Sequence, residues 1–303
     1  MANNVIAPTT TESRNPNTLA IDAVPTLEMV TIMNAEDHKV ADAVQQTLPQ
    51  IAKAIDRIAA RVAEGGRLIY MGSGTSGRLG ILDASECPPT FNTPYDLVIG
   101  LIAGGPEAIT RAQEDAEDDH SAGARDIADL AVTGRDTVVG LTTSGGTPYV
   151  LGGLAEARAR GALTIGVTCN RPALIDTYAD ITISVIVGPE VVTGSTRLKA
   201  GTAQKMVLNM LSTGVMIRLG KTYGNLMVDL RATNAKLRDR ARRIVAQACD
   251  IEEDQAAEVL QQCNQEVKTA IVTVLAGVKP DQARQRLADH DGVVRDALRD
   301  TYG

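Results

Sequence analysis

Two glutamates, Glu86 and Glu117, have the positions expected of groups that move protons. Glu86 follows a predicted helix over residues 76–85 and precedes Pro88 and Pro89, which are expected to stop that helix. A carboxyl group near the end of a helix feels the negative end of the helix dipole, which favours the protonated form and suits a general acid. A solvent-facing glutamate in an ordinary turn explains the same sequence equally well.

Glu117 belongs to an acidic run, residues 114–119, and such runs most often form a solvated face. Its position favours a function, because a predicted helix over 106–117 follows a strand over 97–102. That helix would bring Glu117 back toward the first glycine-rich segment of the chain, residues 72–77. Two carboxylates around one bound sugar can remove a proton and protonate a leaving group.

Two glycine-rich segments, residues 72–77 and 142–148, are typical of loops that bind phosphate. Each follows an apolar run that predicts a buried strand and precedes a helical pattern, so its backbone N–H groups lie at a helix N-terminus. Hydroxyl side chains add further donors. Ordinary strand-to-helix turns would have the same outline. The residues expected to hold the phosphate are Ser73, Gly74, Thr75, Ser76, Thr143, Ser144, Gly145 and Thr147.

A third segment, residues 188–199, again places hydroxyl and charged side chains between a strand and a helix. Arg197 or Lys199 could neutralise a phosphate or a substrate carboxylate. Either could equally cap the following helix or pair with Glu190. The candidate substrate contacts of this segment are Glu190, Ser195, Thr196 and Lys199.

The elements that would position these residues alternate between strands and helices. Strands are predicted over 67–72, 97–102, 136–142, 163–168 and 181–187, with helices over 76–85, 106–117 and 147–160. This alternation indicates an α/β fold with a parallel sheet covered by helices on both faces. We expect an N-terminal arm over 1–25, a main domain over 26–243 and a small three-helix domain over 244–303.

The composition excludes several classes of partner. A formal net charge of −7, one Phe and no Trp argue against a nucleic-acid partner, because the chain is acidic and poor in base-stacking rings. No run approaches the roughly 20 apolar residues of a membrane span. The four cysteines and three histidines show no metal-like spacing, so we expect no metal and a reducing, cytoplasmic location.

The distance expected between Glu86 and the first glycine-rich segment is too long for one bound sugar phosphate to reach both. A straight helix from Ser76 to Glu86 separates them by about 15 Å, at about 1.5 Å per residue, and a hexose phosphate is shorter than that. Either the helix ends early and the chain folds back, or Glu86 acts in a site completed by the second subunit of a symmetric dimer.

Four segments of the chain closely resemble the family of N-acetylmuramic acid 6-phosphate etherases. They are residues 66–80, 83–90, 188–205 and 223–230, and the third resembles a signature that these enzymes share with the glucokinase regulatory protein. The resemblance extends from near residue 12 to the C-terminus. It implies a sugar isomerase (SIS) domain with a flavodoxin-like parallel sheet, followed by a helical bundle similar to a ubiquitin-associated (UBA) domain.

The same resemblance implies cleavage of the D-lactyl ether of N-acetylmuramic acid 6-phosphate to N-acetylglucosamine 6-phosphate and D-lactate, in the recycling of cell-wall sugar. Glu86 would be the proton donor and Glu117 the second active-site carboxylate. No cofactor is implied, because the open sugar's own C1 aldehyde acidifies the C2 proton. The family is homodimeric and cytoplasmic, and it often carries Arg at the position of Gly146.

Two other functions fit parts of the same pattern. An aldose–ketose phosphate isomerase would also use a carboxylate next to C2, but it would release no lactate. A sugar-phosphate sensor, similar to the glucokinase regulatory protein, would need the phosphate loops alone. The single SIS-sized domain and the presence of both Glu86 and Glu117 argue against the sensor.

Overall fold

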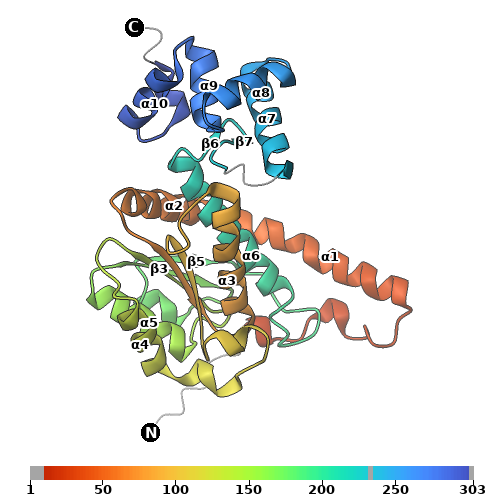
Figure 1. The fold of residues 1–303 in the computed structure, drawn as a ribbon. Helices are drawn as coiled ribbons and strands as arrows, with labels where there is room; N and C mark the ends of the chain where they lie inside the picture. Colours follow the sequence, from red (N-terminus) through yellow and green to blue (C-terminus); the bar gives the residue numbers. More distant parts are fainter. Residues whose placement is uncertain (1–9, 231–234, 300–303) are drawn as a thin grey trace. The chain divides into compact units, whose positions relative to one another are not determined.

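Figure 1 shows the computed structural model of the chain, which describes residues 10–230 and 235–299. These residues group into two compact units, which are described separately below. The first unit covers 10–85 and 95–212, and the second covers 86–94 and the residues from 213 onward. Two helices, α3 (Gly74–Phe91) and α6 (Lys199–Arg218), contribute residues to both units.

The first unit is built on a five-stranded parallel sheet. Its strands are β1 (Leu68–Gly72), β2 (Val98–Ile102), β3 (Thr137–Leu141), β4 (Leu163–Thr168) and β5 (Ile181–Ser184). They lie in the order β2-β1-β3-β4-β5, which is the flavodoxin-like order. Gly72 pairs with Leu141, so the loops that follow β1 and β3 leave the sheet side by side. The predicted α/β fold is confirmed.

Helices cover both faces of this sheet (Figure 1). On one face, α4 (His120–Asp129) and α5 (Pro148–Ala159) pack against alternate strand residues such as Ile69 and Met71. On the opposite face α3 lies so close that a Cβ on Gly80 would come within 2.9 Å of the Tyr70 Cβ. Burial on both faces explains why the strands form continuous apolar runs in the sequence.

The crossover between β2 and β3 differs from the predicted helix over 106–117. Two 3-10 turns, η3 (Pro106–Ile109) and η4 (Glu114–Asp118), take its place, and the α-helix begins only at His120. The Asp119 carboxylate accepts a hydrogen bond from the Ala122 N–H, and this N-cap fixes the helix start. The apolar spacing did not reveal the cap, so the prediction placed the helix too early.

Helix α3 also differs from its prediction, because it continues through Pro88 and Pro89 to Phe91. Proline has a helical φ but removes an N–H donor from the helix, and the side chains of Cys87 and Phe91 on either side of the two prolines are buried. The Asn92 N–H still donates to the Pro88 carbonyl at 2.9 Å, and Asn92 then takes a positive φ of 51°. The helix therefore ends at Phe91, five residues after Glu86.

Residues 10–25 of the predicted N-terminal arm lie against the loops at the carboxyl edge of the sheet, and residues 1–9 of that arm lie outside the described residues. It contains η1 (Thr10–Glu12) and η2 (Pro16–Thr18), and α1 (Thr26–Gln45) follows. The Thr18 hydroxyl donates to the Val191 carbonyl at 2.9 Å, and the Asn170 amide donates to the Thr11 hydroxyl at 3.0 Å. A short break then separates α1 from α2 (Leu48–Ala63), whose first turn contains Pro49.

The second unit is helical apart from a short hairpin of β6 (Thr222–Tyr223) and β7 (Leu226–Met227). Its helices are α7 (Ala235–Cys249), α8 (Glu253–Gln262), α9 (Val267–Ala276), α10 (Pro280–Asp289) and α11 (Val294–Ala297). Residues with positive φ, such as Asp250 and Gly277, separate these helices. Residues 244–299 therefore hold the end of α7 and four further helices, where a three-helix domain over 244–303 was predicted. The unit begins ahead of the expected boundary at 244, because Val228 and Leu230 belong to the same apolar core.

Candidate active site

The first glycine-rich segment forms the turn from β1 into α3. Glycine is required by close packing, since a Cβ on Gly77 would lie 2.6 Å from the Ile102 Cγ1 atom and 2.7 Å from the Gly72 carbonyl oxygen. Gly74 begins the helix with a φ of +51°. The first N–H groups of α3 have no acceptor within the helix, so this turn offers donors and a positive dipole end to an anion.

Glu117 lies directly at this turn. The Ser73 hydroxyl donates to the Glu117 carboxylate at 3.0 Å, although 44 residues separate the two in sequence. Both line a cavity of about 400 Å³ together with Gly74, Arg78, Ala103, Ala108, Ala112 and Gln113. The turn η4 brings Glu117 back to the first glycine-rich segment, and the cavity combines this glycine-rich turn with an exposed carboxylate.

Arg78 is a residue of this cavity that the sequence prediction did not assign to the site. Its guanidinium donates to the carbonyls of Ala108 and Ile109, each at 2.8 Å. These bonds hold η3 against α3 and leave further N–H groups for other acceptors. The one signal in the sequence was its place in the first helical turn after the glycine-rich segment. Arg78 supplies positive charge next to Glu117 and the glycine-rich turn.

Ser76 has a different environment from Ser73. It is buried, and its hydroxyl donates to the Gln204 side-chain carbonyl at 2.8 Å. The hydroxyl proton of Ser76, which we predicted would bind phosphate, is thus used to join α3 to α6. The backbone N–H groups of Thr75 and Ser76 still lie in the first turn of α3.

The second glycine-rich segment lies beside the first, because β1 and β3 are neighbours. Its hydroxyls bond within the loop: Thr142 and Thr147 are 2.7 Å apart, and the Gly146 N–H donates to the Ser144 oxygen at 3.2 Å. Gly145 is buried with a φ of +79°, while Thr143 is half-buried and Ser144 exposed. The loop is therefore folded on itself, with Ser144 presented to solvent.

The charged side chains Glu190 and Lys199 of the third segment, residues 188–199, make structural contacts with α6 and α1. Glu190 is fully buried, and its carboxylate accepts the N–H groups of Lys199 and Ala200, both at 2.9 Å, which caps α6. The Lys199 ammonium, 1% exposed, donates to Glu36 of α1 at 2.7 Å. The prediction that Arg197 or Lys199 caps the helix or pairs with Glu190 is not met for Lys199, because Glu190 is the capping residue and the Lys199 ammonium pairs with Glu36. Ser195 and Thr196 are half-buried in the loop before α6.

Glu36 carries a shifted pKa as a result. Burial alone would raise the pKa of this carboxyl, but hydrogen bonds from Lys199, Lys39 and Asn17 outweigh it and lower the pKa to about 2. Glu36 is therefore ionised, and the buried ion pair ties α1 to the start of α6.

Asp83 and Glu86 lie one turn apart on α3. Asp83 is buried and accepts hydrogen bonds from Tyr70, Asn209 and Ser212, at 2.9, 2.9 and 3.2 Å. Burial raises the pKa of Asp83, and these hydrogen bonds oppose that rise. Glu86 is exposed and belongs to residues 86–94, which group with the second unit. The partnership of Glu86 with Glu117 stays a prediction.

The described residues contain neither a cluster of metal ligands nor a membrane-spanning helix. Within residues 10–230 and 235–299, no three His, Cys, Asp or Glu side chains gather as a metal site would require. In the same ranges, no helix combines the length and the apolar character needed to cross a bilayer.

Comparison with known proteins defines the class first. A family model described as the glucokinase regulatory protein N-terminal SIS domain matches residues 50–158, and one described as the SIS domain matches residues 116–214. The fold is shared with the structure of a phosphoheptose isomerase from Francisella tularensis, with a TM-score of 0.52 and 18% identity over 64% of this chain and 100% of that chain. The sheet, its loops and these matches define a SIS-domain protein.

Two relatives then give the family. The N-acetylmuramic acid 6-phosphate etherase of Clostridium beijerinckii is 58% identical to this chain over 291 residues, which is 96% of each chain. The etherase of the same name from Cronobacter sakazakii is 56% identical over 287 residues, covering 95% of this chain and 97% of that protein. This chain belongs to the family of N-acetylmuramic acid 6-phosphate etherases.

Proposed function

We propose that this protein cleaves the D-lactyl ether of N-acetylmuramic acid 6-phosphate, giving N-acetylglucosamine 6-phosphate and D-lactate in the recycling of cell-wall sugar. The observation that carries the proposal is the hydrogen bond between Ser73 of a phosphate-binding turn and the Glu117 carboxylate. A phosphate on this turn places the sugar chain next to a base. Relatives named for this activity share 56–58% of their residues with the chain.

The reaction is a carbon–oxygen lyase reaction followed by addition of water. Ring opening exposes the C1 aldehyde, and Glu117 takes the acidified proton from C2. The C3–O bond then breaks, a C2=C3 double bond forms, and Glu86 gives a proton to the departing lactate oxygen. Glu86 next activates water, whose oxygen adds to C3 while a proton returns to C2. The aldehyde of the substrate accepts the electrons during elimination, so no cofactor enters the scheme.

We also propose that the active protein is a homodimer whose sites are shared. Support comes from α3, which runs without a break from Gly74 to Phe91, so the alternative in which the helix ends early does not apply. Ser76 and Glu86 stay about 15 Å apart along this helix, at about 1.5 Å per residue. Glu86 of one subunit could then serve the phosphate turn of the other.

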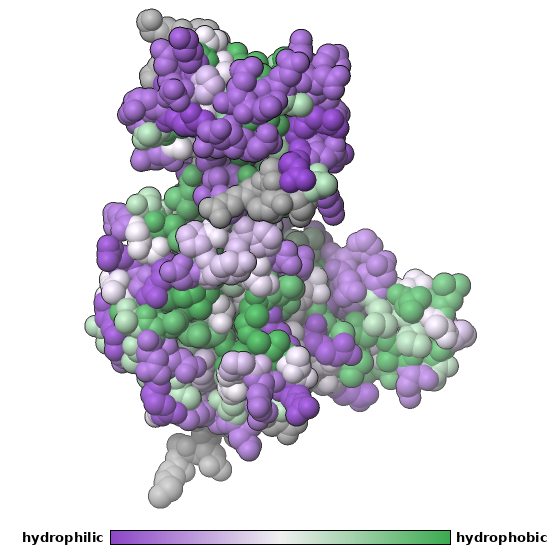
Figure 2. Space-filling model, in the orientation of Figure 1, coloured by the Kyte–Doolittle hydropathy of each residue, from purple (hydrophilic) through white to green (hydrophobic). Residues whose placement is uncertain are grey.

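A surface on α1 supports the same proposal. Leu27 is 78% exposed and Val30 48% exposed on the first half of α1, and Leu19 just before it is 56% exposed. Figure 2 shows apolar side chains gathered at this end of α1. Contiguous exposed apolar side chains are typical of an interface between subunits.

The location that we propose is the cytoplasm. All four cysteines, Cys87, Cys169, Cys249 and Cys263, are buried free thiols, and burial raises the pKa of Cys169 to about 12. Buried protonated thiols are poor nucleophiles, and they are usual in a reducing compartment.

The proposed function is tested by incubating the purified protein with N-acetylmuramic acid 6-phosphate and a chelator, and by assaying D-lactate. We expect D-lactate and N-acetylglucosamine 6-phosphate in equal amounts. A protein that binds the sugar phosphate but isomerises it, or leaves it intact, would instead be an isomerase or a sensor. Fructose 6-phosphate serves as the matched phosphorylated sugar without the ether.

A further inference from the structure

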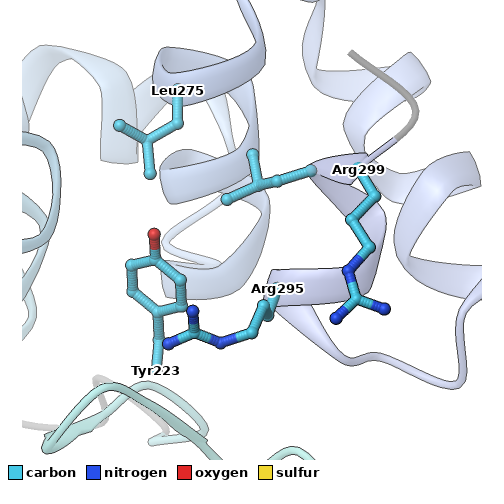
Figure 3. A pocket seen from close by; sticks show the side chains of 5 residues that line it. Tyr223, Leu275, Arg295 and Arg299 are labelled. Carbon is cyan, nitrogen blue, oxygen red and sulfur yellow. The ribbon is translucent and has the colours of Figure 1, made fainter. Parts of the chain in front are cut away.

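A second cavity, of about 410 Å³, lies within the second unit beside the β6–β7 hairpin. It is lined by Tyr223, Leu275, Arg295, Leu298 and Arg299 (Figure 3). Tyr223 opens the segment 223–230, one of the four that resemble the etherase family, and the proposed reaction gives this segment no task. The cavity has the size of a site for a small molecule, since such sites range from about 300 to 1,000 Å³.

Close packing and ion pairs hold the walls of this cavity in place. Gly220, next to the hairpin, approaches Val293 so closely that a Cβ on Gly220 would lie 2.7 Å from the Val293 Cγ2 atom. Val293 immediately precedes α11, which carries Arg295. At the other end of the hairpin, Asp229 pairs with Lys221 at 2.8 Å and with Lys268 at 3.0 Å. Tyr223 and Arg295 therefore stand on two elements that are fixed to each other.

The lining combines one available cation with apolar surface. The Arg295 guanidinium lies 5.8 Å from the centre of the Tyr223 ring, and across the described residues it has no carboxylate within ion-pair distance. Arg299 differs, because it pairs with Asp296 at 3.0 Å and points away from Tyr223 in Figure 3. Leu275 is 36% exposed, and Leu298 adds a second leucine side chain to the lining.

We infer that this cavity binds a small organic anion, in which one carboxylate or phosphate group is attached to a flat apolar body. The anionic group would receive two parallel hydrogen bonds from N–H groups of the planar Arg295 guanidinium, a geometry that suits both carboxylate and phosphate. The apolar body would lie against Tyr223, Leu275 and Leu298. In a chain with a net charge of −7, an arginine that has no carboxylate partner among residues 10–230 and 235–299 favours an anion at this place. The inference does not depend on the etherase activity.

The test measures binding in the cavity through a fluorine signal on Tyr223. The full-length protein is labelled with 3-fluorotyrosine, which gives one fluorine resonance for each of its six tyrosines, and the Tyr223 resonance is assigned by its loss in Tyr223→Phe. Benzoate and phenyl phosphate are titrated in turn, with benzyl alcohol as the neutral analogue and inorganic phosphate as the anion without a body. Binding at the phosphate turns of the first unit would leave the Tyr223 resonance in place.

We expect a saturable shift of the Tyr223 resonance with benzoate, phenyl phosphate or both. The compound that binds more tightly identifies the preferred anionic group. Arg295→Gln should weaken that binding about tenfold or more, the loss typical of a charge-assisted hydrogen bond. Arg295→Lys, which keeps the charge but cannot form two parallel hydrogen bonds, should bind with an intermediate affinity. Arg240→Gln, at an exposed arginine of α7 outside the cavity, should bind as the wild type does.

Three results would overturn the inference. The first is a Tyr223 resonance that does not move with either aromatic anion. The second is equal binding by the wild type and Arg295→Gln when the other five resonances show that the variant is folded. The third is a shift that benzyl alcohol or inorganic phosphate produces as strongly as the aromatic anions, because the cavity would then not require both an anionic group and an apolar body.

Discussion

The proposed chemistry depends at the scale of single residues on Ser73, Arg78 and Glu117, which line one cavity. Ser73 gives its only hydroxyl proton to Glu117, so the serine orients the carboxylate in the absence of substrate. A phosphate at this turn would place two negative groups close together. Arg78 is the cation that reduces their repulsion, because its guanidinium is held at the same cavity by two carbonyls.

Replacing Arg78 with Gln should raise the KM for N-acetylmuramic acid 6-phosphate about tenfold, since a charge-assisted contact contributes roughly 1.5–3 kcal/mol. The effect on kcat should be smaller, because Arg78 acts on binding. Steady-state D-lactate release measures both constants. Arg111→Gln, at an exposed arginine in the same crossover, is the matched control and should match the wild type. An unchanged KM for Arg78→Gln would remove Arg78 from the site.

Glu36 and Lys199 form a buried ion pair that affects stability more than chemistry. Glu36→Gln leaves the Lys199 ammonium buried without a counter-ion, which should lower the free energy of unfolding by about 3–5 kcal/mol at pH 7. Asp37→Asn, at the exposed neighbouring position, should change it by less than about 0.5 kcal/mol. Urea unfolding measures both variants.

The pH dependence of this difference follows from the lowered pKa of Glu36, about 2 in the folded state against an ordinary 4.5. The stabilisation by ionised Glu36 is fully present above pH 4.5 and is lost as the pH falls through 2. The gap between the wild type and Glu36→Gln should therefore shrink between these two values. A gap that stays constant over that range would contradict the assignment.

At the scale of elements, the sequence predicted the strands well because each is an apolar run bounded by glycine or charge. β1 to β5 and the loops after β1 and β3 lie where the runs place them. The crossover was mispredicted because its helix start depends on the Asp119 cap, and apolar spacing carries no information on such a cap. The two prolines after Glu86 were interpreted as the end of the helix, whereas α3 continues through them to Phe91, whose side chain is buried.

The candidate site was only partly predictable for a related reason. Sequence position indicated Ser73 and Glu117, because strand ends in a parallel sheet converge. The partners of Ser76 and Lys199 are Gln204 and Glu36, which approach from α6 and α1. Those contacts depend on how helices distant in the sequence pack, and the local spacing of residues does not predict them.

The turn between β1 and α3 should tolerate no side chain at Gly77, because its Cβ would overlap Ile102 and the Gly72 carbonyl. Gly77→Ala should lower the free energy of unfolding by about 1–3 kcal/mol and weaken phosphate binding. Gly146→Ala is the matched change in the second loop, where the nearest atom to a Cβ is 3.8 Å away and the backbone φ is not positive. Thermal unfolding and phosphate titration compare the two. Equal losses for both glycines would contradict the packing argument.

At the scale of the whole molecule, the proposal is a dimer in which Glu86 and Glu117 of one site come from different subunits. A heterodimer of Glu86→Gln and Glu117→Gln chains, purified by two different tags, then holds one site with both native carboxylates and one with neither. It should show about half the wild-type activity, while each parent homodimer is inactive. A heterodimer as inactive as its parents would show that both carboxylates come from one chain.

The most direct test of the central claim follows the C2 proton. The wild type, Glu117→Gln and Asp118→Asn are each given N-acetylmuramic acid 6-phosphate in heavy water, and D-lactate and deuterium at C2 of the product sugar are measured. We predict both in the wild type and in Asp118→Asn, which alters the neighbouring exposed carboxylate. Glu117→Gln should be slower by about 100-fold or more. If Glu117→Gln released D-lactate and incorporated C2 deuterium at the wild-type rate, Glu117 would not be the base.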